Sequence, residues 1–237
     1  MSAASDALAI AVNLAPVLLV AYLLGSIPFA VVVSRAFGLA DPRSFGSGNP
    51  GATNVLRSGS KPAAGLTLLG DSAKGAVAVL LCRALAGPLG LDATVAAWAG
   101  AAAFGGHLYP VFLRFRGGKG VATFLGTLLA LAPLVGVATC LLWLAIAYLT
   151  RYSSVASMVS AVAAALALSR VGGAPAVLPA VTLMAAFLVW RHRANIAKLF
   201  KGTESKIGQK SAPGTAAADP GSAMPDAAAN GAVDRQR

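Results

Sequence analysis

Long uncharged apolar runs constrain the fold of this chain more than any other feature. Of its 237 residues, 57% are apolar and only 11% are charged, so the apolar residues run together rather than alternating with polar ones. Helices of about 20 apolar residues cross a bilayer and satisfy their own backbone hydrogen bonds there. The sequence therefore predicts an all-α fold, a polytopic membrane helical bundle. Its apolar runs lie at about 7–33, 65–87, 93–112, 120–150, 154–169 and 174–190.

The fourth run decides the number of spans. Residues 120–150 are too many for one ordinary span, and Pro133 divides them into two shorter halves. Two spans here give seven in total and gather most basic residues on one side, which the enrichment of Lys and Arg in cytoplasmic loops marks as cytoplasmic. We therefore predict seven transmembrane helices, with the N-terminus outside and the C-terminus in the cytoplasm.

The N-terminal and C-terminal segments of the chain lead to different predictions. No Lys or Arg precedes the first run, so we predict a retained span rather than a signal peptide. Residues 211–237 are rich in Ala, Pro, Gly and Asp and have no periodic apolar face, which predicts a disordered tail that activity does not need. Residues 1–210 are then a single transmembrane domain.

The net charge of +11 raises the question of nucleic acid. The basic residues lie beside apolar segments without interleaved aromatic side chains, so membrane orientation and anionic substrates explain them better. Cys82 and Cys140 lie far apart in apolar runs and offer neither metal-ligand spacing nor a disulfide framework. We predict no nucleic-acid partner, no metal site and no cofactor.

The first polar cluster is Ser47-Gly-Asn-Pro-Gly-Ala-Thr-Asn-Val-Leu-Arg57. Its glycines allow backbone N–H groups to approach a ligand, its hydroxyls and amides are neutral hydrogen-bonding groups, and Arg57 is a fixed cation. These parts suit a phosphate. The alternative is a helix-capping turn, because Asn-Pro-Gly is a turn signal. The candidate phosphate-binding residues are Ser47, Asn49, Thr53, Asn54 and Arg57.

The second cluster surrounds Lys119. Gly117, Gly118 and Gly120 flank this lysine and precede an apolar run, so a phosphate could meet backbone N–H groups, a helix dipole and an ammonium together. A nucleotide P-loop is excluded, because Gly120 follows the lysine where Ser or Thr is needed and Leu113 replaces the first glycine. The alternative is an ordinary basic cytoplasmic loop.

Two smaller clusters follow. In Arg151-Tyr-Ser-Ser-Val-Ala-Ser157 the three serines fall within one helical turn, and helix packing is as good an explanation as a site. His192 and Asn195 are three residues apart and share a helical face at the end of the last run. Taken alone, a histidine at this place is more often structural than catalytic.

Asp71 and Lys74 are ionisable residues inside the second apolar run. Intramembrane charges usually have a functional role, but residues three apart on one helix face can also neutralise each other. We favour a structural ion pair that shapes the cavity over a catalytic pair.

The segments SGNPGATNVLRSG, GHLYPVFLRFRGGKGVAT, RYSSVAS and WRHRANIAKLFKGTESKI together resemble the bacterial membrane family of acyl-phosphate:glycerol-3-phosphate acyltransferases. The resemblance covers about residues 15–207. It implies transfer of a fatty acyl group from acyl phosphate to the 1-hydroxyl of glycerol 3-phosphate, giving 1-acyl-glycerol 3-phosphate (lysophosphatidate) and phosphate. That reaction is the first acylation step of phospholipid biosynthesis.

The resemblance also implies surroundings and partners. It suggests a multi-pass protein of the bacterial cytoplasmic (inner) membrane, with seven helices and an active site that faces the cytoplasm. The expected partners are acyl phosphate, glycerol 3-phosphate and the lipid bilayer, with a functional link to the enzyme that makes acyl phosphate. We expect a monomer.

Site residues carry over from the family at matching positions. Ser157, His192 and Asn195 are the expected catalytic residues, and the segment Gly117–Gly120 is the expected phosphate loop. Small departures occur at Pro50 and Val155, and the chain extends past the usual end. The residues that the resemblance places around the site are Ser47, Arg57, Lys119, Ser157, His192 and Asn195.

The sequence also bears on mechanism. No Ser-His-Asp set is evident, and neither His107 nor His192 is followed five positions later by Asp, as in acyl-CoA-dependent glycerophosphate acyltransferases. We therefore predict direct transfer without an acyl-enzyme. The proton acceptor stays open between His192 and the phosphate of the acyl donor.

A phosphate or organic-anion transporter is the main alternative function. Transporter sites also use glycine-interrupted helices and basic groups within the membrane. They usually lie near the midplane between repeated halves, whereas no internal repeat is visible here and the polar clusters gather at one predicted face. A purely structural membrane protein is a third alternative, but it leaves the segment 47–57 unexplained.

Overall fold

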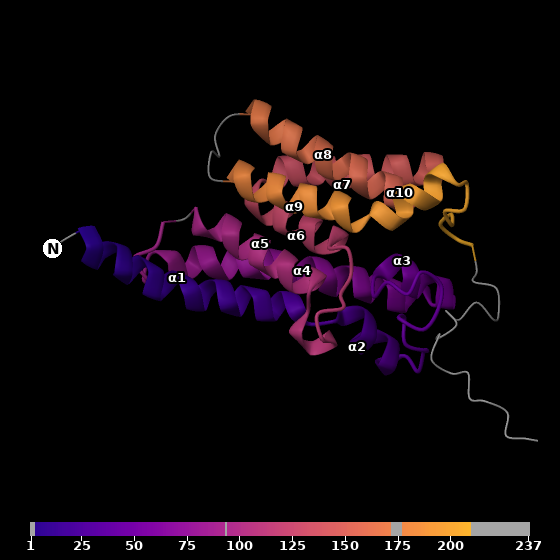
Figure 1. The fold of residues 1–237 in the computed structure, drawn as a ribbon, viewed down its shortest axis with the longest axis horizontal. Helices are drawn as coiled ribbons and strands as arrows, with labels where there is room; N and C mark the ends of the chain where they lie inside the picture. Colours follow the sequence, from indigo (N-terminus) through magenta and orange to yellow (C-terminus); the bar gives the residue numbers. More distant parts are fainter. Residues whose placement is uncertain (1–2, 93, 172–176, 210–237) are drawn as a thin grey trace, which may run out of the picture.

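The computed structural model describes residues 3–92, 94–171 and 177–209, and every regular element in these ranges is a helix (Figure 1). The predicted all-α class is confirmed for these ranges. The longer helices are α1 (Ala3–Ser26), α4 (Lys61–Ala86), α5 (Val95–Leu108), α6 (Val121–Leu131), α7 (Pro133–Thr150), α8 (Ser153–Val171) and α9 (Val177–Arg191). The shorter ones are α2 (Phe29–Ala36), α3 (Ala52–Val55), the 3-10 turns η1 (Leu56–Ser58) and η2 (Val111–Leu113), and α10 (Arg193–Phe200).

Four segments are long and apolar enough to cross a membrane, namely Val12–Ala36, Lys61–Ala86, Pro133–Thr150 and Ser153–Val171. The predicted division of residues 120–150 is confirmed, since α6 ends at Leu131 and α7 begins at Pro133. With 11 residues, α6 rises only about 16 Å, roughly half the thickness of the hydrocarbon core. The count of seven spans and the external N-terminus stay predictions.

The first predicted span, 7–33, is not a single helix. It is interrupted at Ile27 and Pro28, between the end of α1 at Ser26 and the start of α2 at Phe29. Pro28 has no N–H to donate and disfavours helical geometry in the residue before it, which explains the break. The carbonyl of Ile27 accepts a hydrogen bond from Nζ of Lys74 at 3.0 Å.

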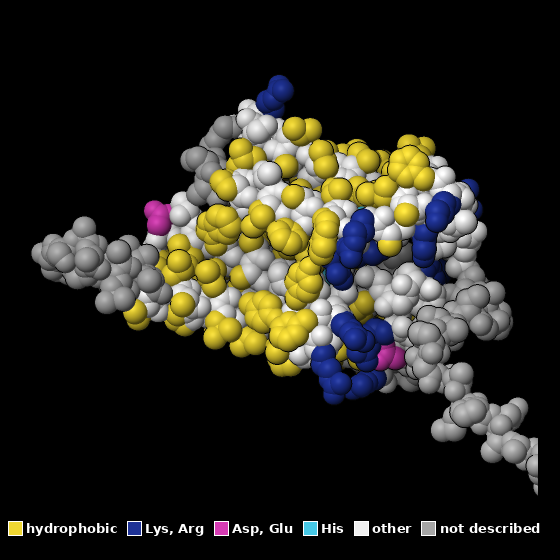
Figure 2. Space-filling model, viewed as in Figure 1, with side chains coloured by type: hydrophobic (Ala, Val, Ile, Leu, Met, Phe, Trp, Pro, Cys, Tyr) yellow, Lys and Arg dark blue, Asp and Glu magenta, His cyan; other side chains and the backbone are white. Residues whose placement is uncertain are grey.

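Glycines set the closest approaches between helices. A Cβ at Gly126 of α6 would lie 1.9 Å from the carbonyl oxygen of Ser72 in α4, and one at Gly25 of α1 would lie 2.0 Å from that of Ala103 in α5. Small residues at such crossings are how membrane helices gain packing contacts. Large apolar side chains point outward over much of the surface instead, as the yellow area of Figure 2 shows and as Leu134 (88% exposed) illustrates.

The Gly126→Ala variant is therefore expected to be clearly destabilised. The added methyl group has no room beside the Ser72 backbone, so α4 and α6 must separate, and such overpacking typically costs about 1–3 kcal/mol. Thermal unfolding of the purified protein in detergent measures the loss. Gly87→Ala is the matched control, since a Cβ there meets nothing within 4 Å. Equal melting temperatures for both variants would contradict the tight crossing.

The polar segments gather at one end of the bundle. The short helices α2, α3 and α10 all lie at the end of the molecule away from the N-terminus (Figure 1), and Lys and Arg side chains concentrate toward the same end (Figure 2). This arrangement agrees with the prediction that the polar clusters share one face. The predicted disordered tail, 211–237, lies outside the described residues.

Candidate active site

A cavity of about 890 Å³ lies among the predicted polar clusters. Ten of the twelve predicted site residues line it, and the two others, Gly117 and Gly118, lie beside it. One part of the lining is apolar and comes from α4, α6 and α7, namely Leu68, Leu125, Leu129, Cys140, Trp143 and Leu144. The predicted residues in the lining are Ser47, Asn49, Thr53, Asn54, Arg57, Lys119, Gly120, Ser157, His192 and Asn195.

Asn54 organises the first cluster. Its side-chain Nδ2 donates to the carbonyls of Pro42 (2.5 Å) and Phe45 (3.2 Å). Its Oδ1 accepts from the backbone N–H of Ser47 (3.0 Å) and from Nη1 of Arg57 (3.4 Å). Asn54 is only 2% exposed, and these four hydrogen bonds of its side-chain amide connect distant parts of the loop. Asn54 thus stabilises the turn, as the alternative interpretation of this segment expected. Ser47 and Asn49, in contrast, line the cavity.

Arg57 brings a positive charge into the cavity. Its Nη2 donates to the hydroxyl of Ser205 at 2.7 Å, a neutral partner that leaves the guanidinium charge available to an anion. Partial burial lowers the pKa of Arg57, and the nearby carboxylate of Glu204 opposes that shift. A guanidinium is so strongly basic that Arg57 stays charged at neutral pH under such a shift.

The loop that carries Lys119 is held from two sides. Arg191 donates through Nη2 to the carbonyl of Gly117 (2.9 Å) and through Nη2 and Nε to that of Gly118 (2.9 and 3.1 Å). On the other side, the N–H of Gly118 donates to the carbonyl of His107 at 3.1 Å. The backbone of the loop is therefore fixed before any ligand arrives.

The glycines of this loop have a use that the sequence did not reveal. A Cβ at Gly118 would lie 2.3 Å from Nε2 of His107, and one at Gly117 would lie 2.2 Å from the carbonyl oxygen of His107. Both glycines thus permit close packing, and the N–H of Gly118 is already bonded rather than free for the predicted phosphate. Of the three glycines only Gly120 is in the cavity lining, and it has φ of 81° and directly precedes α6.

Lys119 starts a chain of hydrogen bonds across the cavity. Its Nζ donates to Oδ1 of Asn195 (2.6 Å), whose Nδ2 donates to Oε1 of Glu204 (2.7 Å). The hydroxyl of Ser154 donates to the same carboxylate oxygen (2.7 Å). Burial lowers the pKa of Lys119 to about 8, while the negative charge of Glu204 opposes the shift. Glu204 was not predicted as a site residue, although it is a lone acid in a basic segment.

Ser157 is buried and fully engaged. Its hydroxyl donates to the carbonyl of Ser153 at 2.7 Å and accepts from Nε1 of Trp143 at 3.0 Å. The hydroxyl proton is thus committed to a carbonyl and not to a base that could activate it, as a nucleophilic serine requires. Nearby, the hydroxyls of Thr53 and Ser153 lie 3.3 Å apart and join the first and third clusters.

His192 is a buried imidazole in the cavity lining, with 2% of its surface exposed. Its Nδ1 lies 2.8 Å from the carbonyl of Leu188. A carbonyl only accepts, so Nδ1 carries the proton and Nε2 keeps its lone pair. Burial, together with the charge of Lys119, lowers the pKa of His192 to about 4. The ring is therefore neutral at pH 7 and can accept a hydrogen bond from a hydroxyl.

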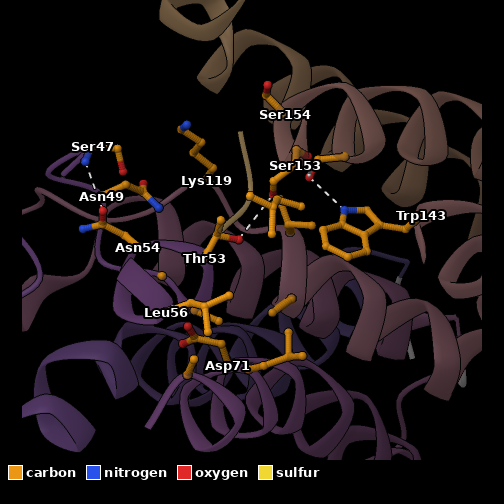
Figure 3. A pocket seen from close by; sticks show the side chains of 18 of the residues that line it. Ser47, Asn49, Thr53, Asn54, Leu56, Asp71, Lys119, Trp143, Ser153 and Ser154 are labelled. Carbon is orange, nitrogen blue, oxygen red and sulfur yellow. Dashed lines mark hydrogen bonds between the residues drawn. The ribbon is translucent and has the colours of Figure 1, made fainter. Parts of the chain in front are cut away.

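The close view brings these parts together. Lys119 projects between Ser47 and Asn49 on one side and Ser153 on the other (Figure 3). The first, second and third polar clusters, far apart in sequence, thus meet around one lysine. A cavity that is lined by cationic side chains in one part and by apolar side chains in another suits an amphiphile with an anionic head.

Sequence comparisons place the chain among known proteins. A family model described as glycerol-3-phosphate acyltransferase matches residues 15–202. A glycerol-3-phosphate acyltransferase of Paraburkholderia phymatum is 58% identical over 194 residues, covering 82% of this chain and 92% of the relative. One of Ralstonia pickettii is 61% identical over 192 residues, covering 81% and 93%.

Solved structures agree with the sequence comparisons. The crystal structure of PlsY (YgiH), an integral membrane glycerol 3-phosphate acyltransferase, in its glycerol 3-phosphate form superimposes with a TM-score of 0.76. It is 39% identical in sequence and the match covers 82% of this chain and 96% of that one. Its lysophosphatidic acid form gives a TM-score of 0.74. The chain is thus a membrane protein and belongs to the glycerol-3-phosphate acyltransferase family.

Proposed function

We propose that this protein transfers a fatty acyl group from acyl phosphate to the 1-hydroxyl of glycerol 3-phosphate. The products are 1-acyl-glycerol 3-phosphate and inorganic phosphate. The observation that carries the proposal is the pairing, in one cavity, of the cations Lys119 and Arg57 with an apolar wall from α4, α6 and α7. Membership of the family supports the acceptor, and the structures of its relative include glycerol 3-phosphate and lysophosphatidic acid forms.

The family resemblance and the cationic lining of the cavity support acyl phosphate as the donor. Acyl phosphate is a mixed anhydride, so its carbonyl is already activated, and its phosphate is a good leaving group. The protein must then hold two phosphates, orient the hydroxyl and stabilise the oxyanion that forms. Lys119, Arg57 and the N-terminus of α6 at Gly120 supply positive potential for these tasks.

The reaction needs no covalent enzyme intermediate. The hydroxyl oxygen of glycerol 3-phosphate attacks the acyl carbon, the tetrahedral intermediate collapses, and the bond between the acyl carbon and the phosphate oxygen breaks. The proton of the hydroxyl passes to Nε2 of His192 or to the departing phosphate. Direct transfer is favoured because the Ser157 hydroxyl donates to a backbone carbonyl rather than to a base.

The roles of the remaining site residues follow from their contacts. Asn195 connects Lys119 to Glu204 and thereby fixes the ammonium, while Ser47, Asn49 and Thr53 provide neutral hydrogen-bonding groups along the same cavity. The apolar wall would take the fatty chain. We place the cavity at the cytoplasmic face of the bacterial inner membrane, in a monomer supplied by the enzyme that makes acyl phosphate.

Product formation tests this function directly. Purified protein in detergent would receive palmitoyl phosphate with and without glycerol 3-phosphate, with palmitoyl-CoA as a parallel donor. We expect phosphate release that depends on glycerol 3-phosphate, and lysophosphatidate from the acyl phosphate only. Product from palmitoyl-CoA alone would overturn the donor. No product from either donor, in folded protein, would leave anion uptake into liposomes as the next measurement.

Activity is expected to decline as the pH rises through about 8. The buried ammonium of Lys119 has a pKa lowered to about 8, so it is charged below that pH and loses its charge above it. A profile of kcat/KM from pH 6 to 10, corrected for spontaneous hydrolysis of the donor, measures the decline. In Lys119→Arg the residual activity should persist to higher pH, because a guanidinium stays charged. An unchanged alkaline limb in that variant would assign the titration to another group.

A further inference from the structure

Asp71, Lys74 and His107 form a buried cluster at the active-site cavity, whose lining includes Asp71 and His107. Nζ of Lys74 lies 2.8 Å from Oδ1 of Asp71, which confirms the ion pair expected between these residues. Nδ1 of His107 lies 3.5 Å from the same carboxylate oxygen. The three residues are 2%, 5% and 8% exposed, respectively. The group thus joins α4, which carries Asp71 and Lys74, to α5, which carries His107.

The cluster makes contacts beyond its own ion pair. Lys74 donates to the carbonyl of Ile27, which lies at the break between α1 and α2 (3.0 Å). The carbonyl of His107 accepts from the N–H of Gly118, and its ring leaves no room for a side chain there. A second cavity, only about 10 Å³ in volume, is lined by all three residues together with Gly117 and Gly118. The cluster therefore reaches from the first helix to the Lys119 loop.

Its position relative to Lys119 points to a role. The Arg191 guanidinium donates to the carbonyls of Gly117 and Gly118 on one side of the loop. On the other side, the backbone carbonyl of His107 accepts from the N–H of Gly118. Lys119 is the next residue after Gly118, so these contacts fix the backbone next to the lysine. Buried ionisable groups within membrane helices are costly, and an ion pair that only neutralised itself would require neither His107 nor a contact with this loop.

We propose that Asp71, Lys74 and His107 are positioning residues, which hold the Gly117–Lys119 segment so that the Lys119 ammonium meets a substrate phosphate. The cluster acts through the loop, and it donates no group to the reaction. Asp71 and the His107 ring fix α5 against α4, and the His107 carbonyl passes that constraint to Gly118. The part that concerns the phosphate rests on the function proposed above.

Hydrogen exchange tests the positioning without any assay of activity. The double variant Asp71→Asn/Lys74→Met removes both charges at nearly constant shape, which buried ion pairs often tolerate. His107→Gln is a second, independent variant. We expect amide exchange in the segment around Gly118 to accelerate at least 10-fold in both variants, with exchange in α8 unchanged. Asp92→Asn removes an exposed carboxylate between α4 and α5 and is the control. An unchanged loop, or equal acceleration in all helices, would overturn the proposal.

A mutant cycle tests whether the cluster acts through Lys119. We expect the double variant to lower kcat/KM at least 10-fold in a protein that still contains Lys119. Added to Lys119→Ala, the same two changes should have almost no further effect, because coupled residues give non-additive losses. Fully additive losses would show a merely structural role and overturn the proposal. If the unmodified protein transfers no acyl group, the proposed function fails, and hydrogen exchange alone decides whether the cluster holds the loop.

Discussion

Replacing Lys119 by Ala is expected to lower kcat/KM by about 10²- to 10³-fold, which corresponds to about 2.7–4 kcal/mol of transition-state stabilisation. The ammonium lies in the cavity with Arg57 and is held by Asn195 at 2.6 Å. In a buried site, a pre-positioned charge stabilises the phosphate and the developing oxyanion more than it would in water. Initial rates with palmitoyl phosphate and glycerol 3-phosphate measure the loss.

The Lys119→Ala variant should remain folded. Lys119 lies in a loop whose backbone is held by Arg191 and His107, and neither contact uses the lysine side chain. Size-exclusion chromatography and melting temperature in detergent check this. Lys201→Ala is the matched control, since Lys201 is exposed and lies outside the cavity lining. Full activity of folded Lys119→Ala protein would exclude the phosphate-loop assignment.

Much of the fold follows from local features of the sequence. The apolar runs correspond to helices because a helix is the form in which a chain satisfies its backbone in lipid. Pro133 correctly marked the boundary between α6 and α7, since a proline donates no backbone hydrogen bond. Pro28 carries the same signal, yet the sequence interpretation treated residues 7–33 as one span, and the structure breaks there.

The sequence located the polar segments that line the cavity, while the roles of their residues stay predictions. Hydroxyl, amide and basic residues are conspicuous in an apolar chain, so composition alone reveals them. Their roles depend on contacts between distant segments, such as those of Arg191 with Gly117 and Gly118, which are separated by more than 70 positions. Residue spacing along the sequence does not predict contacts between segments that are so far apart. The close packing of Gly118 against His107 was therefore not predicted, and the turn alternative for residues 47–57 did not specify the hydrogen bonds of Asn54.

Glu204 is the clearest omission. It belongs to the segment WRHRANIAKLFKGTESKI that carried the family resemblance, but nothing in its spacing predicted that it would lie near Lys119. In the structure it accepts hydrogen bonds from Asn195 and Ser154, and its charge acts on both Lys119 and Arg57. It thus connects α8 and α10 to the cations of the cavity. Its removal is predicted to have the second-largest effect on activity.

Glu204→Ala is expected to lower kcat/KM by about 10²-fold, or about 2.7 kcal/mol. The variant removes the acceptor for both Asn195 and Ser154, so Asn195 is free to turn away and Lys119 loses the partner that orients it. Truncating one partner in a partly buried, charged hydrogen-bond network leaves the others unpaired, which is why a large loss is expected. Steady-state kinetics measure the loss, and Asp92→Asn, a change of an exposed carboxylate, is the control.

Glu204→Gln separates the two contributions of this side chain. The amide keeps an oxygen acceptor and nearly the same shape, but it has no negative charge to oppose the burial of Lys119. The pKa of Lys119 is about 8 with Glu204 present and raised by it, so in Glu204→Gln it must fall below 8. The alkaline decline in kcat/KM should therefore begin at lower pH than in the unmodified protein, with a smaller loss than in Glu204→Ala at pH 6. A decline at the original pH would mean that Glu204 acts only as a hydrogen-bond acceptor and that its charge does not reach Lys119.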